Sequence, residues 1–247
     1  MNSDFFDLSE LVFTRGDDVV NPGTTIYNPA YSTVRTFKGD DYIIGNSSVS
    51  FGLGVSIEVA AEAIGQGLNP ANSVEFVTQA KLNVNGIINR GEIYTNRGQD
   101  IVNGSATANI TAVAQTVSEA IAIANAYDAT AIANSLASVE ISAIANGINN
   151  SGKISTGAGS DTVAGEVKAS VAAVATASID VTAIVTAIAQ TPMSEGLKAV
   201  AAGFATSLAE AKVIARGIDN TCGDIRTNSG ADKISAIATS YSATYAE

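Results

Sequence analysis

A spaced cassette, T-x-x-G-x-D-x-[IV]-x-[GA], recurs along the chain and restricts its fold more than any other feature of the sequence. Its four full copies match without a gap and occupy residues 36–45, 95–104, 156–165 and 227–236. A shorter form, TRGDDVVN, starts at Thr14. Each of the five copies carries an aspartate at the same point of the pattern: Asp18, Asp41, Asp100, Asp161 and Asp232. Recurrence of this kind predicts a repeat protein, in which each copy forms one structural unit.

A second pattern, G-I-x-N-x-G-x-I-x-T, precedes three of the cassettes. It starts at Gly86, Gly147 and Gly217, and its last copy is one residue longer. The cassette aspartates are 23, 59, 61 and 71 residues apart. The first distance fits a single solenoid coil, whereas the longer ones indicate coils with a long excursion or groups of shorter coils. We therefore expect a single repeat domain over residues 1–247, with units at about 1–30, 31–85, 86–146, 147–216 and 217–247.

The cassette has the chemistry of a backbone corner. A glycine two residues before an aspartate allows a positive φ, and the aspartate carboxylate can accept backbone N–H groups that the turn exposes. The β-branched residues that follow favour the start of a strand. We expect the five corners to stack in a column along one edge of the molecule.

Apolar residues alternate on both sides of the corners, which predicts strands. The runs after the cassettes involve Val49–Ile57, Ala106–Ala114, Val167–Val171 and Ile237–Tyr245, and those before the next corner involve Val74–Val84 and Val139–Ala145. The period changes between them. Leu197, Val200, Phe204, Leu208 and Ala211 fall on one helical face, which predicts a helix at about 195–211. The Ala-rich stretches at 56–68 and 116–139 fit either short helices or bent strands.

The predicted fold class is therefore mainly β: a parallel β-solenoid with glycine-aspartate corners and one or more connector helices. Composition agrees, since 46% of the residues are hydrophobic, only 6% are aromatic and tryptophan is absent. Such a chain is too apolar to remain disordered. Its small side chains favour a core between closely spaced backbones.

Charge restricts the partners. The net charge of −11 repels nucleic acid and anionic lipid surfaces. No run of 18 apolar residues is present, so we expect no membrane insertion. The first residues lack the basic and apolar regions of a secretory signal. We expect an extracellular or cell-surface protein exported without a cleaved N-terminal signal, with a cytoplasmic protein as the alternative.

Stacked carboxylates repel one another unless they are screened or bridged, and Ca²⁺ is a suitable bridge for carboxylate and carbonyl oxygens. The candidate metal ligands are the cassette aspartates together with their acidic neighbours: Asp17, Asp18, Asp40, Asp41, Asp100, Asp161 and Asp232. The alternative is that each aspartate caps its corner without metal. Asn89, Asn150 and Asn220 can form an amide ladder or adopt left-handed turns. Cys222 is expected to be a small buried residue, with an intermolecular crosslink as the alternative.

The cassette TGAGSDTVAG resembles the G-G-x-G-x-D-x-U-x nonapeptide of RTX (hemolysin-type) calcium-binding repeats, with Gly157, Gly159 and Asp161 at the matching positions. The other cassettes keep only the second glycine and the aspartate. In that family, aspartates of neighbouring coils share Ca²⁺ inside a parallel β-roll, so the resemblance implies the same cofactor here. The corners followed by Ala-rich strands also resemble secreted or surface repeat proteins of cyanobacteria.

These features favour a structural protein rather than an enzyme. Without histidine, paired cysteines or tryptophan, acid-base and nucleophilic schemes must rest on carboxylates, lysine or tyrosine. We expect a structural repeat protein that associates with itself head to tail, with the strand at 233–246 pairing with the N-terminal segment of a neighbour. The alternatives are a monomeric Ca²⁺- or ligand-binding surface module and, less favoured, a carbohydrate-active β-helix enzyme.

Overall fold

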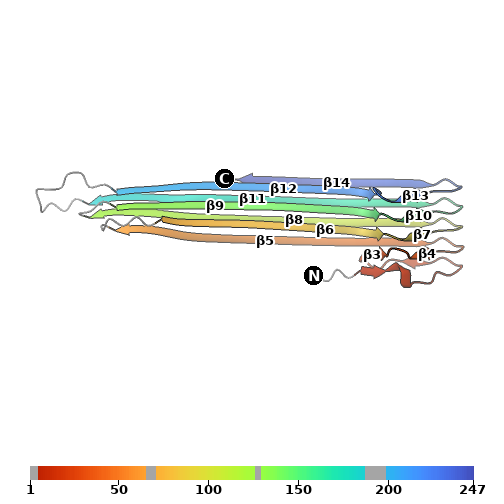
Figure 1. Ribbon diagram of the computed structural model, residues 1–247. Helices are drawn as coiled ribbons and strands as arrows, with labels where there is room; N and C mark the ends of the chain where they lie inside the picture. Colours follow the sequence, from red (N-terminus) through yellow and green to blue (C-terminus); the bar gives the residue numbers. More distant parts are fainter. Residues whose placement is uncertain (1–4, 65–70, 126–128, 187–198) are drawn as a thin grey trace, which may run out of the picture.

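Each cassette turns the chain from a short strand into a long one, and the repetition builds three parallel sheets. The computed structural model describes residues 5–64, 71–125, 129–186 and 199–247. Every strand pair in it is parallel. The predicted mainly β parallel solenoid is confirmed, and its axis runs from the N-terminal coil to the C-terminal strand (Figure 1).

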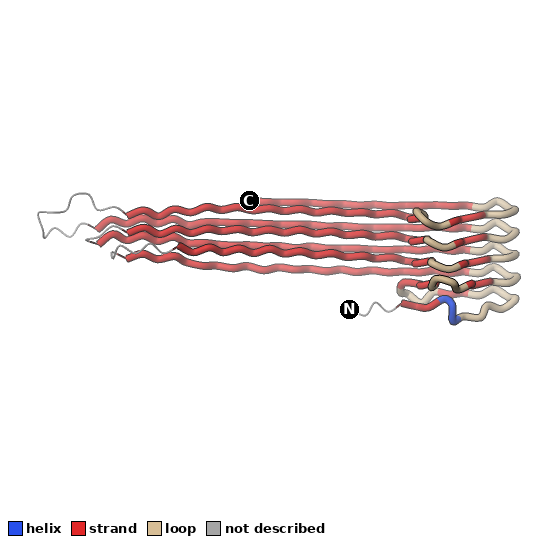
Figure 2. Tube along the Cα trace, viewed as in Figure 1, coloured by secondary structure: helices blue, strands red, loops and turns tan. Residues whose placement is uncertain are grey.

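Two of the sheets are long. The first contains β1 (Phe5–Asp7), β3 (Thr25–Asn28), β6 (Ala71–Asn89), β9 (Ala129–Asn150) and β12 (Ala199–Asp219), in that order. The second contains β2 (Val19–Val20), β5 (Tyr42–Ile64), β8 (Ile101–Asn125), β11 (Thr162–Thr186) and β14 (Lys233–Ala246). Strands of up to 25 residues give a flat, elongated stack (Figure 2).

A short third sheet closes one end of the stack. It contains β4 (Thr33–Arg35), β7 (Glu92–Tyr94), β10 (Lys153–Ser155) and β13 (Asp224–Arg226). In each full coil the chain leaves the corner along the second sheet, returns along the first, crosses through the third and enters the next corner. The first coil is short: β1 is followed by the 3-10 helix η1 (Leu8–Glu10), β2 and β3. All five cassettes therefore line one end, at the right of Figure 1, as predicted.

The core differs between the two ends of each coil. Near the corners it consists of β-branched side chains such as Ile43, Ile93 and Val163, each fully buried. Along the long strands it consists mainly of alanine, including Ala112 and Ala173. Between the two regions the sheets approach so closely that a Cβ on Gly104 would lie 2.1 Å from the carbonyl oxygen of Gly147. The glycine that ends the first three full cassettes, Gly45, Gly104 and Gly165, thus permits the approach of the return strand.

The structure contradicts the predicted connector helix. Residues 199–211 belong to β12, and 195–198 lie outside the described residues. The helical period competes with a two-residue period of small side chains, and small inward residues such as Ala209 pair with Val139 in register. Pairing with β9 over this length outweighs the helical preference, because tertiary contacts override local propensity. The consequence is that Phe204 and Leu208 face outward, 68% and 59% exposed.

The described parts of the two Ala-rich stretches are also strands, in β5, β8 and β9. No α-helix is present in the described ranges, and none of their helices is long and apolar enough to cross a membrane. The alternating runs predicted in the first three repeats do face the core. In β14 the apolar run faces outward instead, because Ile237 and Tyr241 pair with Glu166 and Ser170 of the outer face. The prediction of a buried Cys222 is wrong, since that thiol is exposed on the extra residue of the last repeat.

Candidate functional site at the stacked corners

The corners stack in contact through their second glycines. Gly39, Gly98, Gly159 and Gly230 have φ values of 131°, 150°, 155° and 149°. A Cβ on Gly159 would lie 1.6 Å from the carbonyl oxygen of Gly98 in the preceding coil. The position therefore needs glycine twice over, for its positive φ and for the close approach of the neighbouring corner.

The cassette aspartates form a hydrogen-bonded column through the corners. In each coil the aspartate N–H donates to Oδ1 of the aspartate in the next coil. The four donor–acceptor distances are 2.9 Å from Asp18 to Asp41, 3.0 Å from Asp41 to Asp100, 3.0 Å from Asp100 to Asp161, and 3.1 Å from Asp161 to Asp232. The first member is closed off locally, because the N–H of Thr14 donates to Asp18 Oδ2 at 2.7 Å. This column provides the backbone hydrogen bonds that the capping interpretation requires.

The second carboxylate oxygens of the three interior aspartates are unpaired. Asp41, Asp100 and Asp161 are each 1% exposed, and their Oδ2 atoms have no hydrogen-bond partner. The buried hydroxyls of Thr36 and Thr156 also lack one. Burial raises the pKa of Asp100 above its ordinary value, and both the hydrogen bond from the Asp41 N–H and the neighbouring Thr95 hydroxyl oppose that shift. The surroundings of Asp100 thus favour the neutral form of its carboxyl group.

The predicted second acidic position extends over only two coils. The N–H of Asp40 donates to Asp17 Oδ1 at 2.9 Å, and the N–H of Gln99 donates to Asp40 Oδ1 at 2.8 Å. Within the described residues, no group of three or more Asp, Glu, Cys or His side chains is placed to hold a metal ion. These contacts favour capping, and Ca²⁺ binding by the seven aspartates stays a prediction.

The asparagines of the second pattern form an amide ladder at the return corner. Asn28 donates to Asn89 at 2.7 Å, Asn89 to Asn150 at 2.6 Å, and Asn150 to Asn220 at 2.6 Å, each from Nδ2 to Oδ1. The predicted ladder is therefore present, and Asn28 extends it into the first coil. Ser32 closes its N-terminal end, because the hydroxyl donates to Asn28 Oδ1 at 2.6 Å.

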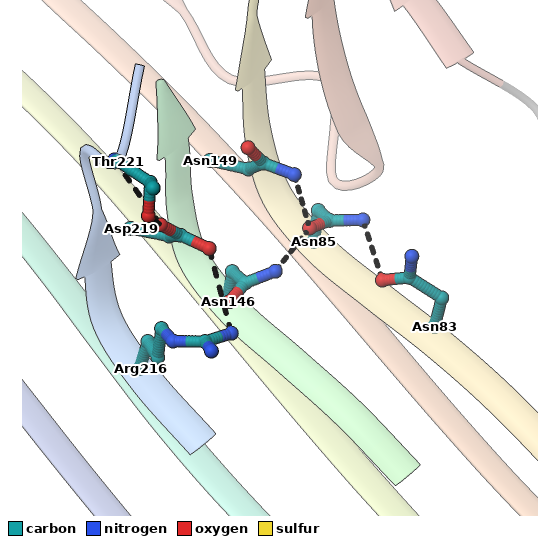
Figure 3. A network of polar contacts seen from close by, with 7 residues as sticks. All are labelled: Asn83, Asn85, Asn146, Asn149, Arg216, Asp219 and Thr221. Atoms are coloured by element: carbon teal, nitrogen blue, oxygen red, sulfur yellow. Dashed lines mark hydrogen bonds and ion pairs between the residues drawn. The ribbon is translucent and has the colours of Figure 1, made fainter. Parts of the chain in front are cut away.

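Figure 3 shows a further polar network, whose residues Asn85 and Asn146 precede the ladder residues Asn89 and Asn150 on β6 and β9. Asn146 donates to Asn85 at 2.9 Å, and Asn85 donates to Asn83 at 3.1 Å. In the last full coil Arg216 takes the position paired with Asn146 and lies 3.4 Å from Asp219. These groups hold the return corner in place through contacts with one another.

Sequence reasoning missed the basic residues at the tip of the corners. Arg15, Lys38 and Arg97 line a hollow at the outer surface of the cassettes. The signal was present in the sequence, since each of the first three cassettes has a cation directly before its glycine.

Comparison with known proteins assigns no family. No family model matches the chain, and neither a curated protein nor a solved structure matches it.

Proposed function

We propose that the protein is a structural repeat protein of an extracellular or cell-surface assembly, and that copies associate end to end by extending their sheets. The observation that carries this proposal is the state of the terminal strands. Among the described strands, β14 pairs only with β11 and β12 pairs only with β9, so each long sheet has an unpaired edge in the described structure. Open edges of this length are a template for further strands.

The hydrogen-bonded columns are open at the same end. Asn220 accepts from Asn150, and Asp232 accepts from the N–H of Asp161. Within the described part of the chain, neither the Nδ2 group of Asn220 nor the N–H of Asp232 donates onward. A further layer of backbone and amide acceptors would continue the pattern of every interior coil.

The opposite end offers a partner surface along the long strands. In the described structure the short first coil pairs with β5 at Tyr42 and Ile43 and with β6 at Ile87–Asn89, and its further hydrogen bonds to these two strands reach only Asn46 and Asn85. Beyond it, the open space between the sheets is an apolar groove of about 370 Å³, lined by residues that include Val49, Phe51, Ala80 and Leu82. Joining this end to the β12 and β14 edges of another copy would bury apolar surface. Such burial stabilises a contact by about 25 cal/mol per Å² of apolar surface.

The first coil also fixes how copies can meet. It projects as a step below β5 and β6 at the corner end (Figure 1). Its corner is closed by Thr14 and Ser32, so it offers no continuation of the two columns. Head-to-tail contact therefore requires that neighbouring copies be displaced along the strand direction. Repetition of such a contact does not return to the first copy, so it builds a filament.

The test uses two lysine substitutions on the same strand. Ser242 pairs with the buried Val171 and faces inward, whereas Thr239 pairs with Lys168 and faces outward. Under an added strand the lysine of Ser242→Lys would be buried, and the lysine of Thr239→Lys would stay in solvent. We expect the wild type and Thr239→Lys to grow in mass with concentration in light scattering, and Ser242→Lys to remain monomeric.

A wild type that stays monomeric at high concentration would reject assembly and favour the alternative, a monomeric ligand-binding surface module. Equal assembly of both variants would reject edge pairing through β14 as the mechanism.

A further inference from the structure

A hollow of about 650 Å³ lies on the outer surface of the stacked corners. Its walls include Arg15, Phe37, Lys38, Asn96, Arg97 and Asn228. All of them belong to the second and third positions of the cassettes. The site is therefore separate from the aspartate column and from the strand edges proposed for assembly.

The hollow results from one coil with small residues. The third cassette positions pair in register, Lys38 with Arg97, Arg97 with Ala158, and Ala158 with Ser229. The coil at Gly157 and Ala158 has almost no side chain at this surface, so it forms a recess between larger neighbours. A Cβ on Gly157 would lie 1.2 Å from the carbonyl oxygen of Asn96. The backbones are thus in contact at the floor of the recess.

The cations of the hollow are free. The ion pairs of the described residues join Lys168 to Glu166, Arg216 to Asp219 and Arg226 to Asp224, all outside the hollow. The nearby carboxylates Asp17 and Asp40 accept backbone N–H groups rather than these cations. Three unpaired cations thus gather at one point of a protein whose net charge is −11. Such a concentration attracts anions locally.

The other residues that line the hollow can contact uncharged parts of a ligand. Asn96 and Asn228 use their Nδ2 groups on the carbonyls of Thr36 and Thr156, which leaves their Oδ1 atoms as acceptors for hydroxyl groups. Phe37 is 47% exposed and offers an apolar ring face. Guanidinium forks match the oxygens of phosphate and sulfate groups. An extended polyanion would place charges along the acidic remainder of the molecule. These charges would lie farther from the three cations than the screening length of about 8–10 Å, so the cations would not offset their repulsion.

We propose that the corner hollow binds a sugar that carries one phosphate or sulfate ester. The ester oxygens contact Arg15, Lys38 and Arg97, the sugar hydroxyls donate to the two asparagine oxygens, and the ring lies against Phe37. The proposal does not depend on end-to-end assembly.

Calorimetric titration of the full chain at low salt tests the proposal. The probes are glucose 6-phosphate and glucose 6-sulfate, with glucose, inorganic phosphate and inorganic sulfate as comparisons. We expect saturable binding of both esters, at least tenfold weaker binding of the inorganic ions, and no binding of glucose. If only one of the two esters binds, the result shows whether the site takes phosphate or sulfate esters, and the assignment of the site is upheld.

Two variants test the place of binding. Lys38→Gln/Arg97→Gln removes two cations of the hollow, and Lys81→Gln/Lys212→Gln removes two exposed cations of the long strands as the matched control. We expect at least a tenfold loss for the first and less than a twofold change for the second. Ala158→Leu fills the recess without a change of charge and should also abolish binding.

Three results would overturn the proposal: no saturable binding by the wild type, equal losses in the two double variants, or equal affinity for the esters and the inorganic ions. Dextran sulfate that binds equally well to the wild type and to Ala158→Leu would likewise show a general polyanion surface in place of the hollow. Circular dichroism confirms that each variant keeps the strand spectrum.

Discussion

Asp100, flanked by Asp41 and Asp161 in the column, serves two requirements that conflict. Its Oδ1 atom accepts from the backbone N–H of Asp41 in the preceding coil, while burial penalises its charge. The corner role of the aspartate was predictable from the glycine two residues before it. The unpaired Oδ2 was not, because it depends on how closely neighbouring coils pack.

The first prediction separates the contribution of the Asp100 hydrogen-bond acceptor to stability from the contribution of its charge. Asp100→Ala removes the acceptor of the Asp41 N–H and should lower the free energy of unfolding by about 1–3 kcal/mol. Asp100→Asn keeps an acceptor and removes the charge, so it should be at least as stable as the wild type at pH 7. Denaturant titration measures both.

The pH dependence of the same variants checks the cause. Since the pKa of Asp100 is raised above 3.8 in the folded state, its contribution to stability is fully present below pH 3.8 and is lost as the pH rises through the folded-state pKa. The advantage of Asp100→Asn over the wild type should therefore shrink as the pH falls towards 3.8. A constant difference at all pH values would contradict the burial argument.

The second prediction concerns Ca²⁺. Because the Oδ1 atoms are already used by backbone N–H groups, we expect EDTA to leave the melting temperature of the wild type unchanged. A decrease in EDTA that is reversed by Ca²⁺ and absent from Asp41→Asn would show that the carboxylates bridge Ca²⁺, as the resemblance to RTX repeats implies. Mg²⁺ at the same concentration controls for ionic strength.

At the scale of elements, the strands with strict alternation were predictable and the region around 195–211 was not. Alanine and serine satisfy either period, so only the few large residues at 197–211 carried the helical pattern. The neighbouring strand decided the outcome, since residues 199–219 match the length and register of β9. In β14 the same ambiguity placed the apolar half of the alternation on the outer face.

The third prediction tests this arrangement with a matched pair. Leu208 on β12 is 59% exposed and pairs with Ser138, whereas Ile141 on β9 is fully buried. Leu208→Ala should change the free energy of unfolding by about 0.5 kcal/mol or less. Ile141→Ala should lower it by about 2–5 kcal/mol. A large loss from Leu208→Ala would show that this side chain packs against a core, as it would in the helix predicted from the sequence.

At the scale of the whole molecule, the repeat spacing predicted coils but not their shape. A spacing near 60 residues fits one coil with long strands or several short coils equally well. In the structure each repeat forms one coil with long strands, because the Ala-rich inner faces allow two sheets to lie close together over up to 25 residues. Short coils would have required further corner glycines within each excursion, and only one cassette per repeat supplies them.

The fourth prediction therefore concerns the radius of gyration of the single molecule. A strand of 25 residues spans about 80 Å at about 3.3 Å per residue, while five strands and two sheets span only about 25 Å and 20 Å. A plate of these dimensions has a radius of gyration of about 25 Å. A compact globular chain of 247 residues would have about 18 Å. Small-angle X-ray scattering of Ser242→Lys, extrapolated to zero concentration, measures the single molecule without assembly. A value near 18 Å would mean that the long strands fold back into shorter coils, and it would also remove the extended edges on which end-to-end assembly depends.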